Sequence, residues 1–230
     1  MERVSVINGK RPIILVAPHG YDQDDQNTDL IAETIANQID AYAVINRGWE
    51  RSDSVDYAHD KADCNNVYHC KEDVVREEFL EPIIRFKNRI IRDFDRAFIF
   101  YIHGMSNKHR KISGDPNLDI VVGYGAGSPH SFTCEDWQKN FLISNLNQAG
   151  LRTYEGKKGG AMSGWSRNNM NQYFRKWEHD PLVSSFQLEI IYELRNEKDI
   201  AALTADYLAI AFKDLAKSRS FKGQVNWGCY

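Results

Sequence analysis

Short apolar runs alternate with longer amphipathic stretches along this chain. Apolar runs of about 4–8 residues are typical of strands buried on both faces of a sheet, and apolar positions three or four residues apart are typical of helices. Strands are predicted over residues 13–16, 41–46, 97–102, 119–124 and 186–192, with an edge strand over residues 3–7. Helices are predicted over residues 29–38, 72–95, 134–148 and 200–217. This alternation predicts a three-layer α/β/α fold, and a length of 230 residues fits one domain over residues 1–230.

Three features interrupt the regular pattern. Pro82 lies inside the second predicted helix and predicts a break or kink there. Residues 47–73 form a long polar segment with little periodicity, and loops of this length in compact domains tend to be functional or mobile. Residues 155–175 are rich in Gly, Ser and Asn and are interpreted as a binding loop.

Composition narrows the class of protein. Hydrophobic residues make up 42% of the chain, enough for a substantial core, and the net charge of -3 gives no basic surface for nucleic acid. No apolar run reaches the roughly 18 residues that span a bilayer, and the N-terminus lacks the apolar core of a signal peptide. The four cysteines form no CxxC pair and are interpreted as free thiols. We therefore expect a cytoplasmic protein with neither nucleic-acid nor membrane partners.

Candidate chemistry lies where predicted strands end. His19 follows the strand at 13–16, an acidic loop comes next, and His103 follows the strand at 97–102. Each histidine precedes a glycine, and one imidazole with several carboxylates could hold a divalent metal. The alternative for the loop is a solvated acidic turn with a helix-capping aspartate. Glu189 interrupts an apolar strand, where a carboxylate needs a cation, a hydrogen-bond network or a site mouth, unless it faces solvent.

The order of these motifs resembles a known family. The runs PHG, DDQNTDLIAETIA, DCNN, IHGMS, DIVVGYGAG and FQLEI, between His19 and about Glu193, are similar to the N-formylglutamate amidohydrolase-like family. That family is related to zinc carboxypeptidase-type and phage poly-γ-glutamate hydrolases. The resemblance implies a zinc carboxypeptidase-like fold, in the wider phosphorylase/hydrolase-like class, with a mixed central sheet and helices on both faces. It also implies one Zn2+ per chain and hydrolysis of an amide bond.

The resemblance also implies roles for particular residues. His19 matches the first histidine ligand, His103 matches the second, and Glu189 matches the general base. The carboxylate ligand has three candidates, namely Asp22, Asp25 and Asp29. Asp29 matches the aspartate of the formylglutamate hydrolases, Asp25 matches the glutamate of the poly-γ-glutamate hydrolases, and Asp22 recreates the carboxypeptidase spacing.

One motif departs from the family. Relatives often carry an Asn-Arg pair whose arginine holds a substrate carboxylate, and here the matching pair is Asn65-Asn66. A bidentate guanidinium clamp is therefore missing at that position. Arg51 and Arg167 could substitute for it or could be surface residues. Asn65, Arg167 and Asn168 are the predicted substrate contacts.

The function that follows is zinc-dependent cleavage of a small N-formyl or N-acyl amino acid, or of a peptide-like amide, by a metal-activated water. Two alternatives stay open. One is a catalytically silent metal- or ligand-binding protein on the same fold, and the other is a cell-wall or γ-glutamyl peptide hydrolase. The sequence leaves the oligomeric state open.

Overall fold

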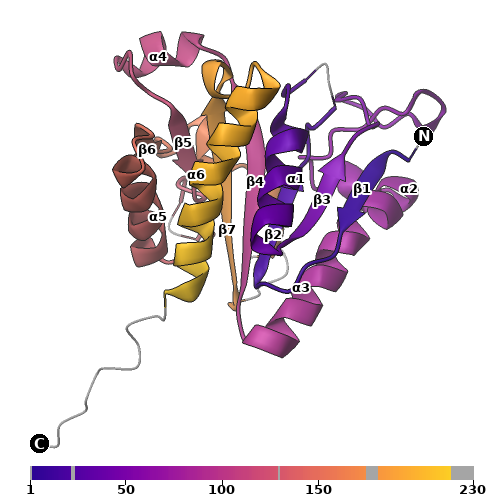
Figure 1. Cartoon of the computed structure of the whole chain (residues 1–230). Coiled ribbons are helices and arrows are strands. Elements are labelled where there is room, and N and C mark those ends of the chain that lie inside the picture. Colours follow the sequence, from indigo (N-terminus) through magenta and orange to yellow (C-terminus); the bar gives the residue numbers. More distant parts are fainter. Residues whose placement is uncertain (1, 22–23, 129, 175–180, 219–230) are drawn as a thin grey trace, which may run out of the picture.

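The predicted central sheet is present and mixed. In the computed structural model, residues 2–21, 24–128, 130–174 and 181–218 are described. Within these residues seven strands pair in the order β1-β3-β2-β4-β7-β5-β6. Strands β2, β3, β4 and β7 are parallel, β1 is antiparallel to β3, and β5 is antiparallel to β7 and parallel to β6 (Figure 1). Their bounds are β1 Val4–Ile7, β2 Ile13–Ala17, β3 Tyr42–Asn46, β4 Ala97–Met105, β5 Ile120–Gly123, β6 Thr153–Glu155 and β7 Val183–Ile191.

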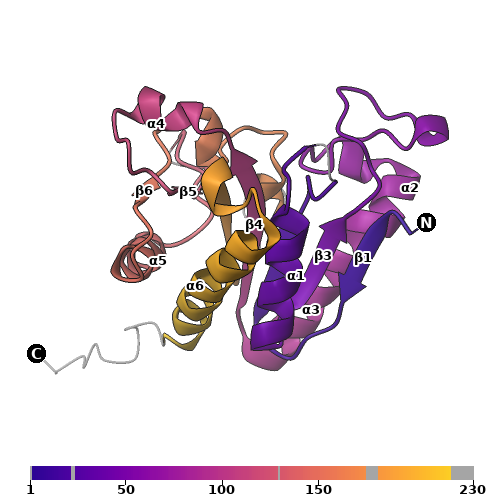
Figure 2. The same ribbon diagram turned by 45° about the horizontal axis from the view of Figure 1, so that its top comes forward.

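Helices lie on both faces of the sheet, as predicted. Helices α1 (Thr28–Ile39), α5 (Asp136–Gln148) and α6 (Lys198–Lys217) cover one face. The other face is covered by α3 (Glu81–Phe94), as the two views in Figures 1 and 2 show. The short helix α4 (Lys108–Ser113) follows β4. No helix among the described residues combines the length and apolarity needed to cross a membrane.

The face under α1, α5 and α6 is a close-packed apolar layer. Alternate residues of the parallel strands point into it, which is the period-2 pattern of a strand. At its centre Phe100 of β4 stacks on Phe212 of α6 at 3.8 Å between ring centroids and on Phe186 of β7 at 5.4 Å. Burial of such rings is the main stabilising term for this half of the core.

Loops share the opposite face with α3. Residues of the irregular segments that sequence analysis singled out are buried there, including Trp49, Cys64, Cys70, Met170 and Phe174. The two loops are hydrogen-bonded to each other, since Val67 N–H donates to Asn168 O at 2.7 Å and Met170 N–H donates to Asn65 O at 2.9 Å. Residues 62–70 are therefore packed against the sheet and the second loop, whereas residues 50–61 are exposed or only partly buried.

Some element boundaries differ from the prediction. Strand β4 continues through His103 to Met105, because β7 pairs with it as far as Ile191, so His103 lies inside the strand and not after it. The break predicted at Pro82 is a π-helical turn, η3 (Arg76–Leu80), which follows α2 (Asp73–Val75) and joins α3, the helix that Pro82 opens. Strand β6 and helix α4 were not predicted, since both are short. Cys64, Cys70 and Cys134 are free thiols, as predicted, and Cys229 lies outside the described residues.

Candidate metal centre

His19 is held at the carboxyl end of β2 by the end of β3. The buried Asn46 amide donates to Pro18 O at 2.9 Å and to Trp49 O at 2.8 Å, so the two strand ends are tied together. Gly20 lies close against this junction, where a Cβ atom would come within 2.7 Å of Asn46 O. The glycine after His19 is therefore required by a close backbone approach.

Asp25 reaches His19 through a tight turn before α1. The N–H of Asp25 donates to His19 O at 3.2 Å, and the Thr28 hydroxyl donates to Asp25 O at 2.8 Å. Asn27 adopts the left-handed conformation, with φ of 61°, which asparagine tolerates better than most residues. This turn directs the Asp25 carboxylate back over the strand ends.

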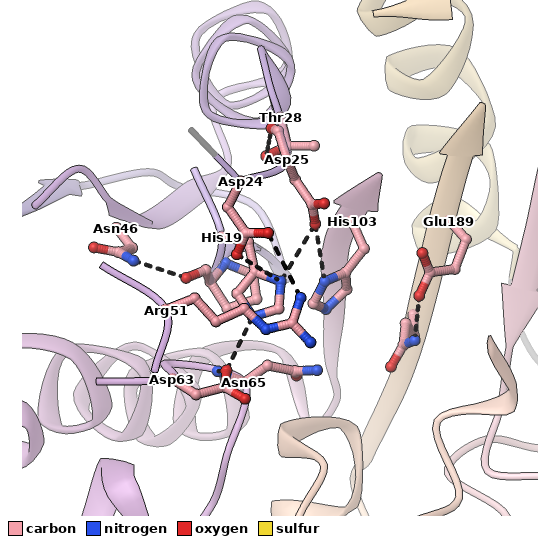
Figure 3. A network of polar contacts seen from close by, with 12 residues as sticks. His19, Asp24, Asp25, Thr28, Asn46, Arg51, Asp63, Asn65, His103 and Glu189 are labelled. Carbon is pink, nitrogen blue, oxygen red and sulfur yellow. Dashed lines mark hydrogen bonds and ion pairs between the residues drawn. The ribbon is translucent and has the colours of Figure 1, made fainter. Parts of the chain in front are cut away.

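Three side chains converge at this point, as Figure 3 shows. Asp25 Oδ2 lies 3.3 Å from His19 Nδ1 and 3.5 Å from His103 Nδ1. The two imidazole rings meet edge to face with centroids 4.9 Å apart. All three residues are buried, with 3%, 7% and 3% of His19, Asp25 and His103 exposed. The structure thus brings His103 of β4 next to His19 and Asp25, which lie close together in the sequence.

Asp63 completes the surroundings of His19. Its carboxylate accepts from His19 Nε2 at 2.9 Å and from the Asn65 N–H at 2.8 Å. Burial alone would lower the pKa of His19, but the hydrogen bonds with Asp25 and Asp63 outweigh burial and raise the pKa to about 9. Burial would likewise raise the pKa of Asp25, but its contacts with His103 and His19 hold that pKa far below its ordinary range. The carboxylates of Asp25 and Asp63 therefore stabilise the protonated form of His19.

The donor set fits a zinc ion. A tetrahedral zinc with bonds of about 2.0–2.2 Å needs ligand atoms about 3.3–3.6 Å apart, close to the separations of Asp25 Oδ2 from the two Nδ1 atoms. One potential ligand atom from each of the three residues lies within 4.8 Å of the others. Histidine ligands commonly donate their other ring N–H to a carboxylate, and Asp63 accepts such a bond from His19. Sequence analysis included Asp63 in the DCNN motif but gave it no role, because a single sequence does not show which distant side chain contacts His19.

Glu189 lies beside this cluster on the neighbouring strand. It is the register partner of His103 across β4 and β7, so both side chains lie on the same face of the sheet. Gln187 Nε2 donates to Glu189 Oε1 at 2.6 Å, and Asn169 Nδ2 donates to Gln187 Oε1 at 2.7 Å. Burial raises the pKa of Glu189, although the nearby His103 opposes that shift. Asp25 and Glu189 therefore have pKa values displaced in opposite directions.

Arg195 holds the turn that carries Asp25. Its buried guanidinium donates from Nη1 to Gln26 O at 2.8 Å and from Nε to Ile190 O at 3.2 Å, and Asn27 Nδ2 donates to Arg195 O at 2.6 Å. These bonds join the Asp25 turn to the end of β7. A Cβ at Gly104 would lie 2.2 Å from Arg195 Cζ, which explains the glycine after His103. Sequence analysis missed Arg195, since nothing in its local pattern distinguishes it from a surface arginine.

The cluster opens into a cleft of about 400 Å³. Its walls include two of the three predicted substrate contacts, Asn65 and Asn168, and the Arg51 that was considered as a substitute cation. Arg51 Nη1 lies 3.5 Å from Asp24 Oδ1, and its side chain is 55% exposed. The carboxamide oxygen of Asn65 is buried with no hydrogen-bond partner among the described residues. It is therefore available to a ligand group in the cleft.

Other predicted site residues lie elsewhere. The structure does not bring Asp29 to the cluster, because its carboxylate pairs with Arg47 Nη1 at 2.5 Å, and Arg47 also binds Glu33. Arg167 is exposed and does not line the cleft, although its neighbour Asn168 does. Asp22 lies outside the described residues.

No protein-family model matches the chain, and no curated protein matches it in sequence. Its structure, however, is similar to solved structures. The N-formylglutamate amidohydrolase from Ralstonia eutropha JMP134 matches with a TM-score of 0.61 and 12% identity, over 94% of this chain and 98% of that one. A bacteriophage poly-gamma-glutamate hydrolase matches with a TM-score of 0.52 and 11% identity, over 92% and 87% of the two chains. A metallo-carboxypeptidase from Burkholderia cenocepacia matches with a TM-score of 0.51 and 11% identity, over 94% and 66%.

These likenesses confirm the predicted fold. They extend over nearly the whole chain, and the three proteins are of the kinds that the sequence motifs resemble. At this low identity they establish the architecture alone, since one fold can host several activities. The activity is therefore argued from the side chains of the site.

Proposed function

We propose that this protein is a zinc-dependent hydrolase that cleaves an amide bond in a small N-acylated amino acid or a peptide-like compound. The observation that carries the proposal is the convergence of Asp25 Oδ2 with the Nδ1 atoms of His19 and His103, beside Glu189. Two imidazoles and one carboxylate form a common ligand set of hydrolytic zinc sites, which keep a position open for water. The names of the three similar structures support this reaction class.

His19, Asp25 and His103 would hold the ion, one per chain. When bound, zinc supplies Lewis acidity, which lowers the pKa of a coordinated water and polarises the scissile carbonyl. Asp63 holds the His19 ring through Nε2, which leaves Nδ1 directed toward Asp25 and free to bind the ion. Arg195 holds the Asp25 turn against the end of β7.

Glu189 is the proposed general base. Its carboxylate takes a proton from the attacking water and returns that proton to the leaving nitrogen. Gln187 orients it through one hydrogen bond, and Asn169 in turn holds the Gln187 carboxamide. A pKa raised by burial favours this role, because a stronger base accepts the proton of water more readily and still releases it to an amine.

Arg51 and Asn65, which line the cleft, are proposed to contact the substrate. The Arg51 guanidinium attracts a substrate carboxylate or the negative charge that develops on the carbonyl oxygen. The orphan Asn65 carboxamide oxygen accepts a substrate N–H. Asn168 lines the same cleft.

Metal content tests the first half of the proposal. Elemental mass spectrometry of the purified protein should find about one zinc per chain, and His19→Ala, His103→Ala and Asp25→Asn should each lose it. Asp29→Asn is the matched control and should keep its metal. Loss in Asp29→Asn with retention in Asp25→Asn would move the carboxylate ligand to Asp29. Absence of metal after zinc has been supplied and the excess dialysed away would overturn the proposal.

Turnover tests the second half. Glu189→Gln should keep zinc and lose about 10²- to 10⁴-fold in kcat, measured by amine release from a panel of N-acyl amino acids. An unchanged rate in this variant would rule out Glu189 as the base. Full zinc occupancy with no turnover of any amide in the wild-type protein would leave a silent metal-binding protein instead.

A further inference from the structure

A single row of side chains crosses the sheet from the candidate metal centre toward its far edge. His103 of β4 pairs with Glu189 of β7, Glu189 pairs with Val121 of β5, and Val121 pairs with Tyr154 of β6. Register partners on adjacent strands point to the same face. The residue next to the proposed general base, on the side away from the metal ligands, is therefore an apolar one.

This row leads into a second cavity. The chamber has a volume of about 720 Å³ and shares three wall residues, His109, Ala161 and Met162, with the 400 Å³ cleft. Leu118 and Val121 form part of its wall, and both pack in a small apolar cluster with Met105 and Ile191. The cleft and the chamber therefore lie side by side and share part of one wall, and Glu189 lines the cleft.

The charged groups around the chamber are largely neutralised. Asp115 accepts from Tyr154 Oη at 2.5 Å and from Arg152 Nε at 3.0 Å, and Glu155 accepts from Lys139 Nζ at 2.6 Å. Lys157 lines the chamber and has no ion-pair partner among the described residues. The chamber therefore offers apolar walls with no unpaired carboxylate to hold a cationic side chain.

We infer that the chamber binds an apolar group next to the scissile amide, either a medium-length acyl chain or an aromatic side chain. This inference rests on the proposed hydrolase function and names its substrate class. A group of this kind leaves water for the Leu118–Val121–Met162 wall, while the amide lies between the metal ligands and Glu189. An N-formyl group is too small to fill the chamber of about 720 Å³.

Met162→Gln is the decisive variant, because it keeps the side-chain length and makes the shared wall polar. Leu203→Gln, on the exposed face of α6, is the matched control. Zinc-loaded protein is assayed with N-formyl-, N-acetyl- and N-hexanoylglycine, and separately with N-acetylglycine and N-acetylphenylalanine. The first series tests the acyl side of the amide and the second tests the amine side. Calorimetric binding of hexanoate and of phenylalanine provides a readout that needs no turnover.

We expect the bulky member of one series to exceed its small counterpart by about tenfold or more in kcat/KM. Met162→Gln should abolish that preference, and Leu203→Gln should keep it. Hydrolysis without such a preference, or with a preference that Met162→Gln leaves intact, would overturn the chamber assignment while the hydrolase function stands. If no amide is hydrolysed, the result counts against the hydrolase function, and calorimetric binding then tests the chamber assignment. Binding of hexanoate or phenylalanine to the wild-type protein that is lost in Met162→Gln would support the assignment. Absence of binding to the wild-type protein would overturn the assignment.

Discussion

The two faces of the sheet are covered by different kinds of structure. The face under α1, α5 and α6 is closed by regular helices over apolar strand residues such as Phe100 and Phe186. The other face shares its cover between α3 and two long loops, which contribute Trp49, Met170 and other buried residues. The loops bring Asp63, Asn65 and Asn168 to the cleft. On the helical side, the turn before α1 contributes Asp25.

This difference separates stability from chemistry. Regular helix-on-sheet packing buries apolar area with little need for polar partners, so it is suited to hold the strands in register. Loops carry backbone and side-chain polar groups to a rigid edge, where ligands and substrates can be bound. Substitutions on the two faces should therefore change different observables.

The largest effect is expected from Phe100→Ala on the helical face. Loss of its stacking with Phe212 and Phe186 leaves a cavity, and the free energy of unfolding should fall by about 3–5 kcal/mol. Denaturant unfolding measures the change, while zinc content per folded molecule should stay unaltered. Leu203→Gln is the control and should shift stability by less than about 0.5 kcal/mol. A stable Phe100→Ala protein that had lost its metal would contradict the separation.

A smaller and different effect is expected from Asp63→Asn on the loop face. Removing the carboxylate that accepts from His19 Nε2 should weaken zinc binding by about 10- to 100-fold. Competition with a chelator measures the affinity. Asp56→Asn is the control. It removes another aspartate–histidine contact, to His59 Nδ1 at 2.7 Å on the protein surface, and should leave the zinc affinity unchanged. Equal affinities for Asp63→Asn and the wild-type protein would show that Asp63 does not support the metal ligand.

The smallest effect concerns acid stability at the chamber. The hydrogen bond from Tyr154, with help from the Asn117 N–H and Arg152, lowers the pKa of Asp115 to about 2. Because the folded-state pKa lies below the ordinary value near 4, the stabilising contribution is present above pH 4 and is lost as the pH falls toward 2. Thermal melts of Asp115→Asn and wild-type protein should therefore differ modestly at pH 6 and converge near pH 2. A gap that widens at low pH would contradict the assigned direction.

Strand and helix patterns predicted most of the architecture, since the periodicity of apolar residues reports which face of each element is buried. They also placed His19 and His103 at one edge of the sheet, because parallel strands present their carboxyl ends together. They did not separate Asp25 from Asp29, since both flank the same helix start and only the ion pair of Asp29 with Arg47 shows where that carboxylate points. Asp63 and Arg195 depend on contacts between distant segments, and a single sequence carries no pattern for those.

The position of β7 couples assembly of the sheet to assembly of the site. This strand comes last along the described chain, yet it is inserted between β4 and β5. Until it arrives, β5 and β6 have no hydrogen-bonded connection to the other described strands, and His103 lacks Glu189 beside it. Pairing between segments so distant in sequence has a high entropic cost and comes late in folding. The candidate metal ligands therefore all precede the proposed general base in the chain, and Arg195, which holds the Asp25 turn, follows it. The site is complete only when β7 and the turn after it have docked.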